Sequence, residues 1–302
     1  MSLQTRSTQW RSWLQLIRLP NLLTVPGDPL AGACLVLALR GSDQLWPALW
    51  AALIALALYA AGLILNDCMD LEEDRLHRPK RPLPSGEIPL VQAATAAVLL
   101  LLLGLGGAIA IGPATATIAA LLTGTILLYN RYLKNIPLLG SLSMGLCRGL
   151  SLMLGATAVG APPIPSGLLL AAALLLVLYI AAVTTLAARE HQAIGLGLKR
   201  WLPYKVLLLL MLLLLITARD KALFSLLPAL IAITECLKIT RALRGVPEPQ
   251  VVQASIGSYI RLLILVQASL CFVQFPIGTT VGVLLILLWP LSCRLGRWFY
   301  AS

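Results

Sequence analysis

The chain is dominated by apolar stretches that are long enough to cross a lipid bilayer. They run at about 20–39, 46–65, 89–111, 114–129, 138–159, 166–188, 203–218, 222–240, 254–275 and 276–293. About 20 mostly apolar residues suffice for a transmembrane helix, and charged residues make up only 12% of this chain. The sequence therefore predicts an all-α, polytopic membrane bundle that forms one domain over 1–302. The short fourth and seventh stretches leave nine or ten transmembrane helices open.

Basic residues gather in every second connection between these stretches. Residues 1–18 precede the first span, and we expect them to form a cytoplasmic or interfacial lead-in. With the N-terminus assigned to the cytoplasm, eighteen of the 23 Lys and Arg residues lie in internal segments and three in external turns. This bias follows the positive-inside rule and predicts a multi-pass protein of the cell membrane. Because membrane topology explains the net charge of +11, no nucleic-acid partner is expected.

Acidic residues concentrate at the end of the second stretch, where six of the 12 lie between Asp67 and Glu87. Asp67, Asp70 and Asp74 have the spacing i, i+3, i+7, which places all three on one face of a continuous helix. Clustered carboxylates repel one another unless a cation lies among them, and Mg²⁺ prefers oxygen ligands that it shares with substrate phosphates. The pattern predicts a Mg²⁺–diphosphate site at the membrane surface. The alternative is a solvated charged loop.

Three connections that we place on the internal side carry polar clusters, at 66–87, 129–134 and 189–200. In a helical bundle these clusters would converge on one cavity that faces the cytoplasm. Carboxylates would hold Mg²⁺, basic side chains would neutralise a diphosphate, and the apolar interior would hold an isoprenoid tail. Charge that develops on a departing diphosphate would be stabilised there, in a cavity that excludes water. An alcohol phosphotransferase would need a glycine- and aspartate-rich loop that is not seen in this sequence.

Arg148 lies near the middle of the fifth span, where an arginine is costly and usually has a partner. Two interpretations stay open. The guanidinium points into the cavity, toward a diphosphate or an acidic acceptor, or it forms a structural pair with Asp28 or Glu235. Asp28 is itself either part of a helix break after 26–27 or a pocket residue.

The pattern Asn66-Asp67-x-x-Asp70-x-x-x-Asp74, followed by Arg75 and by Arg-Pro-Leu-Pro-Ser-Gly at 81–86, resembles the first signature motif of the UbiA superfamily of intramembrane prenyltransferases. The likeness in layout covers the whole chain. It implies about nine transmembrane helices and Mg²⁺-dependent transfer of a prenyl group from a prenyl diphosphate to a lipophilic, aromatic or lipid-like acceptor. It also implies an active site on the cytoplasmic side.

Candidate residues come from this resemblance together with the residue-based reasoning above. The metal and catalytic candidates are Asp67, Asp70 and Asp74, with Lys134 and Arg148 as further catalytic candidates; the substrate-binding candidates are Arg18, Asn21, Asn66, Arg75, Arg81, Tyr129, Arg189 and Glu190.

The sequence departs from the family pattern after the sixth span. A second aspartate-rich motif is usual there, but residues 183–192 contain no aspartate, and Glu190 is the one candidate ligand for a second Mg²⁺. Three outcomes are open. The enzyme uses one metal cluster with Arg189 in place of the second ion, or it uses a donor or leaving group other than the usual one. In the third outcome the chain keeps the binding fold without the chemistry. The last case gives the alternative function, a UbiA-fold membrane protein that binds or helps export an isoprenoid or metabolite precursor. The stretches 143–150 and 180–185 are similar to the EboC branch of the superfamily.

Overall fold

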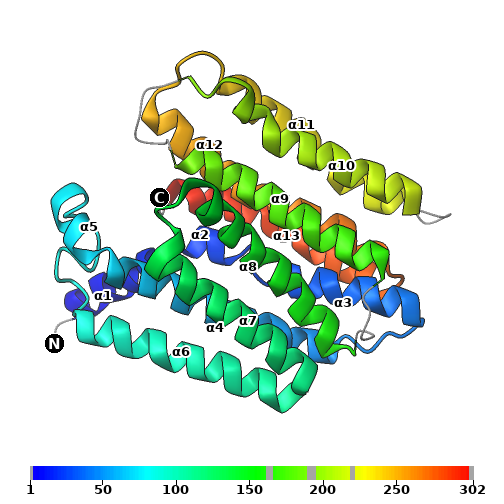
Figure 1. Ribbon diagram of the computed structural model, residues 1–302, viewed down its shortest axis with the longest axis horizontal. Coiled ribbons are helices and arrows are strands. Elements are labelled where there is room, and N and C mark those ends of the chain that lie inside the picture. Colours follow the sequence, from blue (N-terminus) through cyan, green and yellow to red (C-terminus); the bar gives the residue numbers. More distant parts are fainter. Residues whose placement is uncertain (1–2, 161–165, 189–194, 218–221, 299–302) are drawn as a thin grey trace.

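The computed structural model describes residues 3–160, 166–188, 195–217 and 222–298, and this part of the chain consists of helices and their connections (Figure 1). The helices of the first half are α1 (Leu3–Leu16), α2 (Leu19–Leu22), α3 (Gly27–Arg40), α4 (Trp46–Met69), α5 (Leu71–His77), α6 (Leu90–Ile111) and α7 (Pro113–Leu128), which a π-helical turn, η1 (Tyr129–Leu133), continues. Those of the second half are α8 (Pro137–Ala158), α9 (Gly167–Ala187), the 3₁₀ turn η2 (Gly197–Trp201), α10 (Leu202–Thr217), α11 (Ala222–Ala242), α12 (Pro249–Cys271) and α13 (Ile277–Trp298).

The prediction of nine or ten spanning helices is confirmed. Within the described ranges, nine helical segments are long and apolar enough to cross a membrane, and the first of them joins α2 and α3 over Leu19–Arg40. α11 adds a further helix of 21 residues, which packs between α10 and α12. In Figure 1 the chain passes back and forth through the bundle, and α5 lies at the same end of the molecule as both termini. The charged segment after α4 therefore lies at one end of the bundle.

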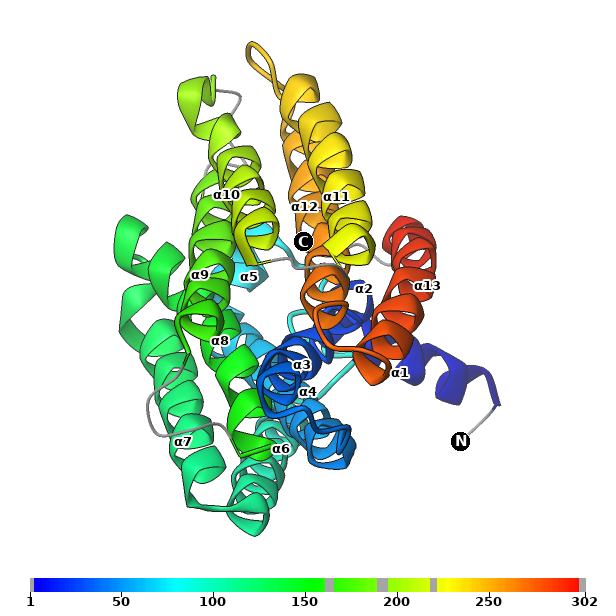
Figure 2. The ribbon, with the colours of Figure 1, turned by 90° about the vertical axis from the view of Figure 1, so that its right-hand side faces the viewer.

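The centre of the bundle is built on close approaches between helices with small residues. α3 packs against α4, α8 and α12, and Figure 2 shows α3 and α4 between the α6–α7 pair and the α11–α13 group. A Cβ on Gly155 of α8 would lie 1.8 Å from the carbonyl oxygen of Pro29, and one on Gly145 would lie 2.2 Å from that of Val177 in α9. Small residues at such crossings let membrane helices approach closely. Burial distinguishes the central helices from the outer ones: in an 18-residue stretch of each helix, 78% of the residues are buried in α12 but only 17% in α6.

α1 forms the predicted helical lead-in and packs by its C-terminal end. Leu16 is 1% exposed and shares a core cluster with Ile64 of α4 and Leu83. The apolar contacts of α1 therefore fix the start of α2 next to the C-terminal end of α4, where the aspartates lie.

Candidate active site

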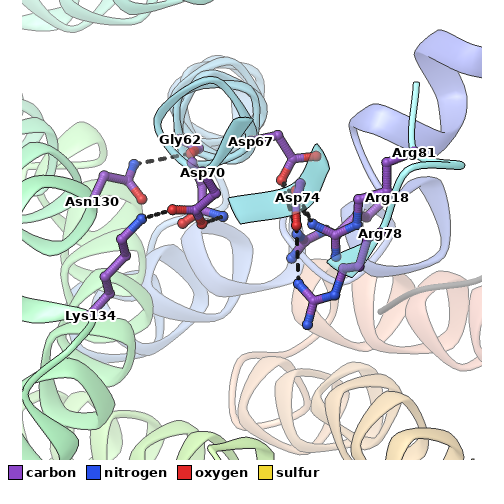
Figure 3. Close-up of polar contacts among 10 residues, drawn as sticks. Arg18, Gly62, Asp67, Asp70, Asp74, Arg78, Arg81, Asn130 and Lys134 are labelled. Atoms are coloured by element: carbon purple, nitrogen blue, oxygen red, sulfur yellow. Dashed lines mark hydrogen bonds and ion pairs between the residues drawn. The ribbon is translucent and has the colours of Figure 1, made fainter. Parts of the chain in front are cut away.

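The helix that carries the aspartates bends at Asp70. α4 ends at Met69, and α5 begins at Leu71 after a residue with φ −90° and ψ 6°. The prediction that three aspartates share one helix face is therefore wrong. The sequence from 66 to 78 contains no glycine or proline, so nothing in its pattern marks this break. As a result Asp67 and Asp74 lie on one side of the bend and Asp70 on the other (Figure 3).

Asp67 and Asp74 share one arginine. Arg81 Nη1 lies 2.7 Å from Asp74 Oδ2 and 3.9 Å from Asp67 Oδ1. Arg18 adds a contact of 3.2 Å from Nη2 to Asp67 Oδ1, and Arg78 one of 3.5 Å from Nη1 to Asp74 Oδ1. Asp67 and Asp74 are 6% and 2% exposed, so two buried carboxylates are neutralised by three guanidinium groups.

Arg18 reaches this position from a strained backbone. It is the non-glycine residue with positive φ in the described chain, at φ 49° and ψ 59°, and it directly precedes α2. Left-handed conformations at residues other than glycine are uncommon and cost energy. Pro20 fixes the first turn of α2, so the chain bends sharply at Arg18 and its guanidinium is held beside Asp67.

Asp70 faces the end of α7 instead. Lys134 Nζ forms an ion pair with Asp70 Oδ1, and Asn66 Nδ2 donates to Asp70 Oδ2 at 3.1 Å. The π-helical turn η1 positions Lys134, and Asn130 of this turn donates from Nδ2 to the carbonyl oxygen of Gly62 at 3.1 Å. Single π turns are frequent at functional sites, and this one ties α7 to α4. We call Asp67, Asp70 and Asp74, with Arg18, Arg78, Arg81 and Lys134, the outer cluster.

The outer cluster borders a cavity of about 340 Å³ between the helices. At the outer cluster its wall includes Arg18, Arg78 and Arg81 together with Asn66 and Tyr129. Deeper in the bundle the wall is mainly apolar and comes from α4, α7, α8, α9 and α12: it includes Leu63, Ile126, Met144, Ile180, Val183, Ile260 and Leu263. The predicted combination of a charged mouth and an apolar interior is thus present in the described chain.

Arg148 lines this cavity and has a buried structural partner, Asp28, which is one of the two partners that the sequence left open. Its Nε lies 2.9 Å from Asp28 Oδ2, and its Nη2 donates to the carbonyl oxygen of Thr24 at 2.8 Å. Gln267 Nε2 donates to Asp28 Oδ1 at 2.6 Å. Asp28 is fully buried and is not part of the cavity wall. Glu235 pairs with Lys238 at 2.6 Å, and Lys238 is largely exposed.

Arg75 was a substrate-binding candidate, but its side chain does not flank the cavity. Its Nη1 lies 2.8 Å from Glu72 Oε1, and the two side chains are 55% and 85% exposed. On α5 the inward positions belong to Leu71 and Asp74, so Arg75 faces away from the cavity. Arg189 and Glu190 lie outside the described residues.

The profile of the UbiA prenyltransferase family matches residues 29–243. This chain belongs to the UbiA prenyltransferase family. The digeranylgeranylglyceryl phosphate synthase of Ignicoccus hospitalis is 35% identical over 152 residues, which cover 50% of this chain and 48% of that protein. The Methanosarcina mazei enzyme of the same name is 30% identical over 190 residues, covering 60% and 63%. The chain thus spans about half the length of the first of these relatives.

Solved structures of UbiA homologues share the fold. One from Aeropyrum pernix K1, in its apo form, aligns with a TM-score of 0.63 at 18% identity over 82% of this chain and 96% of its own. One from Archaeoglobus fulgidus, bound to DMAPP and Mg²⁺, aligns with a TM-score of 0.63 at 17% identity over 89% of this chain and 99% of its own. At this identity the likeness establishes the helical architecture of the UbiA family.

Several residues of this UbiA-family cavity were not among the sequence candidates. Arg78 lines the cavity beside Arg81, Asn130 holds η1 to α4, and Tyr59 and Ser151 line the inner part of the wall. Arg78 belongs to the basic run that follows the aspartate motif, and this run could have identified it as a site residue from the sequence. Tyr59 and Ser151 carry no sequence signal, because single hydroxyl residues are common in membrane helices.

Proposed function

We propose that this chain is a Mg²⁺-dependent intramembrane prenyltransferase, which transfers a prenyl group from a prenyl diphosphate to a lipophilic acceptor. The observation that carries the proposal is the outer cluster at the mouth of an apolar cavity. A diphosphate needs cationic donors, and its hydrocarbon tail needs a dry, apolar space. The wall of this one cavity provides both the cationic donors and the apolar space.

The basic side chains of the outer cluster would bind and stabilise the diphosphate. Arg18, Arg78 and Arg81 offer planar forks that suit phosphate oxygens, whereas Lys134 offers a point charge. They lie where the diphosphate would depart, and electrostatic groups already in place lower the barrier as negative charge develops there. The apolar wall of α8, α9 and α12 would keep water away from the allylic carbon.

The oxygen ligands of the outer cluster suit Mg²⁺. Within the described ranges, no three Asp, Glu, His or Cys side chains form a ready metal-ligand group, because Asp70 is turned away from Asp67 and Asp74. Mg²⁺ is commonly held by one or two carboxylates and completed by water and substrate phosphates, which is the arrangement that Asp67 with Asp74, or Asp70 with Asn66, would allow. When bound, the ion would neutralise diphosphate charge that the basic side chains leave uncompensated.

Charge balance within the outer cluster supports a single metal ion. Four cationic side chains face three aspartates in the described chain, which leaves one positive charge in excess. A diphosphate monoester that carries one Mg²⁺ keeps a small net negative charge and would balance this excess. The absence of aspartates from 183–192 agrees with this balance.

The acceptor and the orientation in the membrane are further parts of the proposal. The relatives are named for the synthesis of digeranylgeranylglyceryl phosphate, so an isoprenyl glyceryl phosphate is one lipid-like acceptor to assay beside aromatic ones. The surplus of basic residues around the outer cluster favours the cytoplasmic side for this end of the bundle, with the N-terminus also inside. We propose the plasma membrane as the location.

The test is binding of labelled prenyl diphosphates of several lengths to the purified chain, with Mg²⁺ or with EDTA. We expect Asp67→Ala and Asp70→Ala to abolish the Mg²⁺-dependent part of binding. Glu72→Ala is the matched control, since it removes a carboxylate from the exposed face of α5, and it should bind as the parent does. Parent-like binding by both aspartate variants would contradict the site assignment. Diphosphate release in the absence of acceptor is then measured, and binding without release or transfer would favour the alternative, a carrier of isoprenoid precursors.

A further inference from the structure

The cavity wall carries polar atoms that the described part of the chain does not satisfy. Asn21 Oδ1 and Ser151 Oγ are buried and have no hydrogen-bond partner in the described chain. Both residues line the cavity and are 4% and 5% exposed. Buried polar atoms nearly always have a partner, and leaving one unpaired costs free energy. Ser151 Oγ, which lies on α8 away from the outer cluster, therefore marks a place where a polar group of a ligand belongs.

Arg148 and Tyr59 surround the same space. Arg148 and Ser151 are three residues apart on α8, so they occupy one face of that helix. Asp28 and Thr24 engage Nε and Nη2 of Arg148, which leaves Nη1 as a donor for which no contact is recorded in the described chain. Tyr59, in the middle of α4, adds a phenol to the cavity wall.

The net charge of the Arg148–Asp28 pair determines whether a neutral or an anionic ligand group is favoured beside it. The Arg148–Asp28 pair is neutral as a whole, and Gln267 fixes the second carboxylate oxygen of Asp28 at 2.6 Å. A carboxylate or phosphate bound beside the pair would add a negative charge that the neutral pair does not compensate, deep in a membrane bundle. A neutral hydroxyl or carbonyl oxygen accepts from Arg148 without that cost.

We infer that Tyr59, Arg148 and Ser151 form an inner polar subsite that binds a neutral hydroxyl or carbonyl oxygen of the acceptor. The inference rests on the proposed function, in which the outer cluster holds the diphosphate of the donor. Tyr59 and Asp67 are eight residues apart on α4, which is about 12 Å along the helix axis. That separation leaves room for a ring or a short chain, whose reacting atom would meet the donor while its oxygen is held at the inner polar subsite.

The test uses three phenols of similar size that differ in the group opposite the hydroxyl. The probes are 4-hydroxyacetophenone with a neutral carbonyl, 4-hydroxybenzoate with a carboxylate, and 4-ethylphenol with neither. Their affinities for the purified chain are measured by equilibrium dialysis in detergent. The parent is expected to bind the acetophenone most tightly, and a preference of the parent for either the benzoate or 4-ethylphenol would overturn the inference.

Ser151→Ala is the decisive variant because Ser151 Oγ has no hydrogen-bond partner to lose in the described chain. It should fold as well as the parent, yet bind 4-hydroxyacetophenone about threefold to tenfold more weakly, as expected for one lost hydrogen bond. Thr123→Val is the matched control: Thr123 Oγ1 is also buried without a partner in the described chain but is not part of this cavity wall. Equal affinities of the two variants for the acetophenone would overturn the inference.

Asp28→Asn tests the charge argument, since it keeps the shape of the side chain and removes its charge. Arg148 then carries an uncompensated positive charge, and the preference should move toward 4-hydroxybenzoate by about tenfold or more. An unchanged preference in folded Asp28→Asn would overturn the inference, and if this variant does not fold, the Ser151→Ala and Thr123→Val comparison decides alone. Prenyl diphosphate binding by the parent is measured separately. If it is absent, the proposed function fails, while the phenol affinities still decide the inner polar subsite.

Discussion

The outer cluster and the Arg148–Asp28 pair use the same chemistry at two depths of the bundle. At the outer cluster, guanidinium groups exceed the carboxylates that they contact, and one arginine is divided between Asp67 and Asp74. At the inner pair, one arginine meets one aspartate, and Gln267 and Thr24 take further polar contacts. Arg18 is a quarter exposed, whereas Asp28 is fully buried.

This difference separates a binding role from an anchoring role. In the outer cluster, Arg18 still contacts Asp67 and Arg78 still contacts Asp74 when Arg81 turns to a ligand, so these buried carboxylates keep a cation during the exchange. A dry pair is held in place, because removal of either partner leaves an uncompensated charge in the interior. We therefore expect substitutions at the outer cluster to act on ligand binding and substitutions at the inner pair to act first on stability.

The largest effect is expected from Arg148→Met. Asp28 then stays buried without its cation, which should lower the free energy of unfolding by about 3–5 kcal/mol. The double variant Asp28→Asn with Arg148→Met removes both charges and should recover most of the loss. Unfolding by SDS in mixed micelles, followed by tryptophan fluorescence, measures both quantities. A loss below about 1 kcal/mol in the single variant, or no recovery in the double variant, would show that Arg148 and Asp28 do not form a water-free ion pair. The distinction between this pair and the outer cluster would then fail.

A smaller change in stability, but a large one in binding, is expected from Arg81→Gln. Arg81 contacts both Asp67 and Asp74 and lines the cavity. The loss of a charged donor to the diphosphate should weaken Mg²⁺-dependent prenyl diphosphate binding by about tenfold to a hundredfold, which corresponds to about 1.5–3 kcal/mol. The free energy of unfolding should fall by less than about 1.5 kcal/mol, because Arg18 and Arg78 still face Asp67 and Asp74 in this variant.

Arg131→Gln is the control for Arg81→Gln, because it removes a basic side chain from the same end of the bundle. Arg131 lies in the π-helical turn, is exposed, and faces the ring of Tyr132. Its substitution should change neither binding nor stability appreciably. If Arg81→Gln reduces stability as much as Arg148→Met does and leaves binding intact, the outer cluster is a structural feature and the distinction fails.

The fold could be predicted from the sequence because the length and apolar character of a run decide whether it can cross a bilayer. The predicted spans agree with the observed helices to within a few residues, except where they omitted charged helix ends such as 66–69 of α4. Asp67 and Asp74 could also be placed together, since two helical turns separate them. The bend at Asp70 could not be predicted, because it depends on Lys134 on one side of the bend and Arg81 on the other.

The partner of Arg148 shows a second limit of sequence reasoning. The sequence left both Asp28 and Glu235 as possible partners of Arg148. Which of them forms the pair depends on which faces of α3, α8 and α12 meet. The contact of Arg148 with Thr24 joins residues 124 positions apart, and that of Gln267 with Asp28 joins residues 239 positions apart. Apolar patterns indicate that such helices are buried but do not give their rotation about their own axes. The unsatisfied Ser151 is hidden from sequence reasoning for the same reason.

The smallest effect is expected from Arg75→Gln. Arg75 was a substrate-binding candidate in the sequence, but the structure places it outside the outer cluster, so this variant tests where the cluster ends. Arg75 pairs with Glu72 on the exposed face of α5, and surface pairs of this kind contribute at most about 1 kcal/mol and often nothing measurable. The free energy of unfolding should therefore change by less than about 0.5 kcal/mol, and prenyl diphosphate affinity by less than twofold. Dialysis with labelled prenyl diphosphate, run beside Arg81→Gln, measures the difference between an arginine of the motif that faces the cavity and one that faces water. A tenfold loss in Arg75→Gln would show that α5 turns to bring Arg75 onto the diphosphate, and the outer cluster would then have to include it.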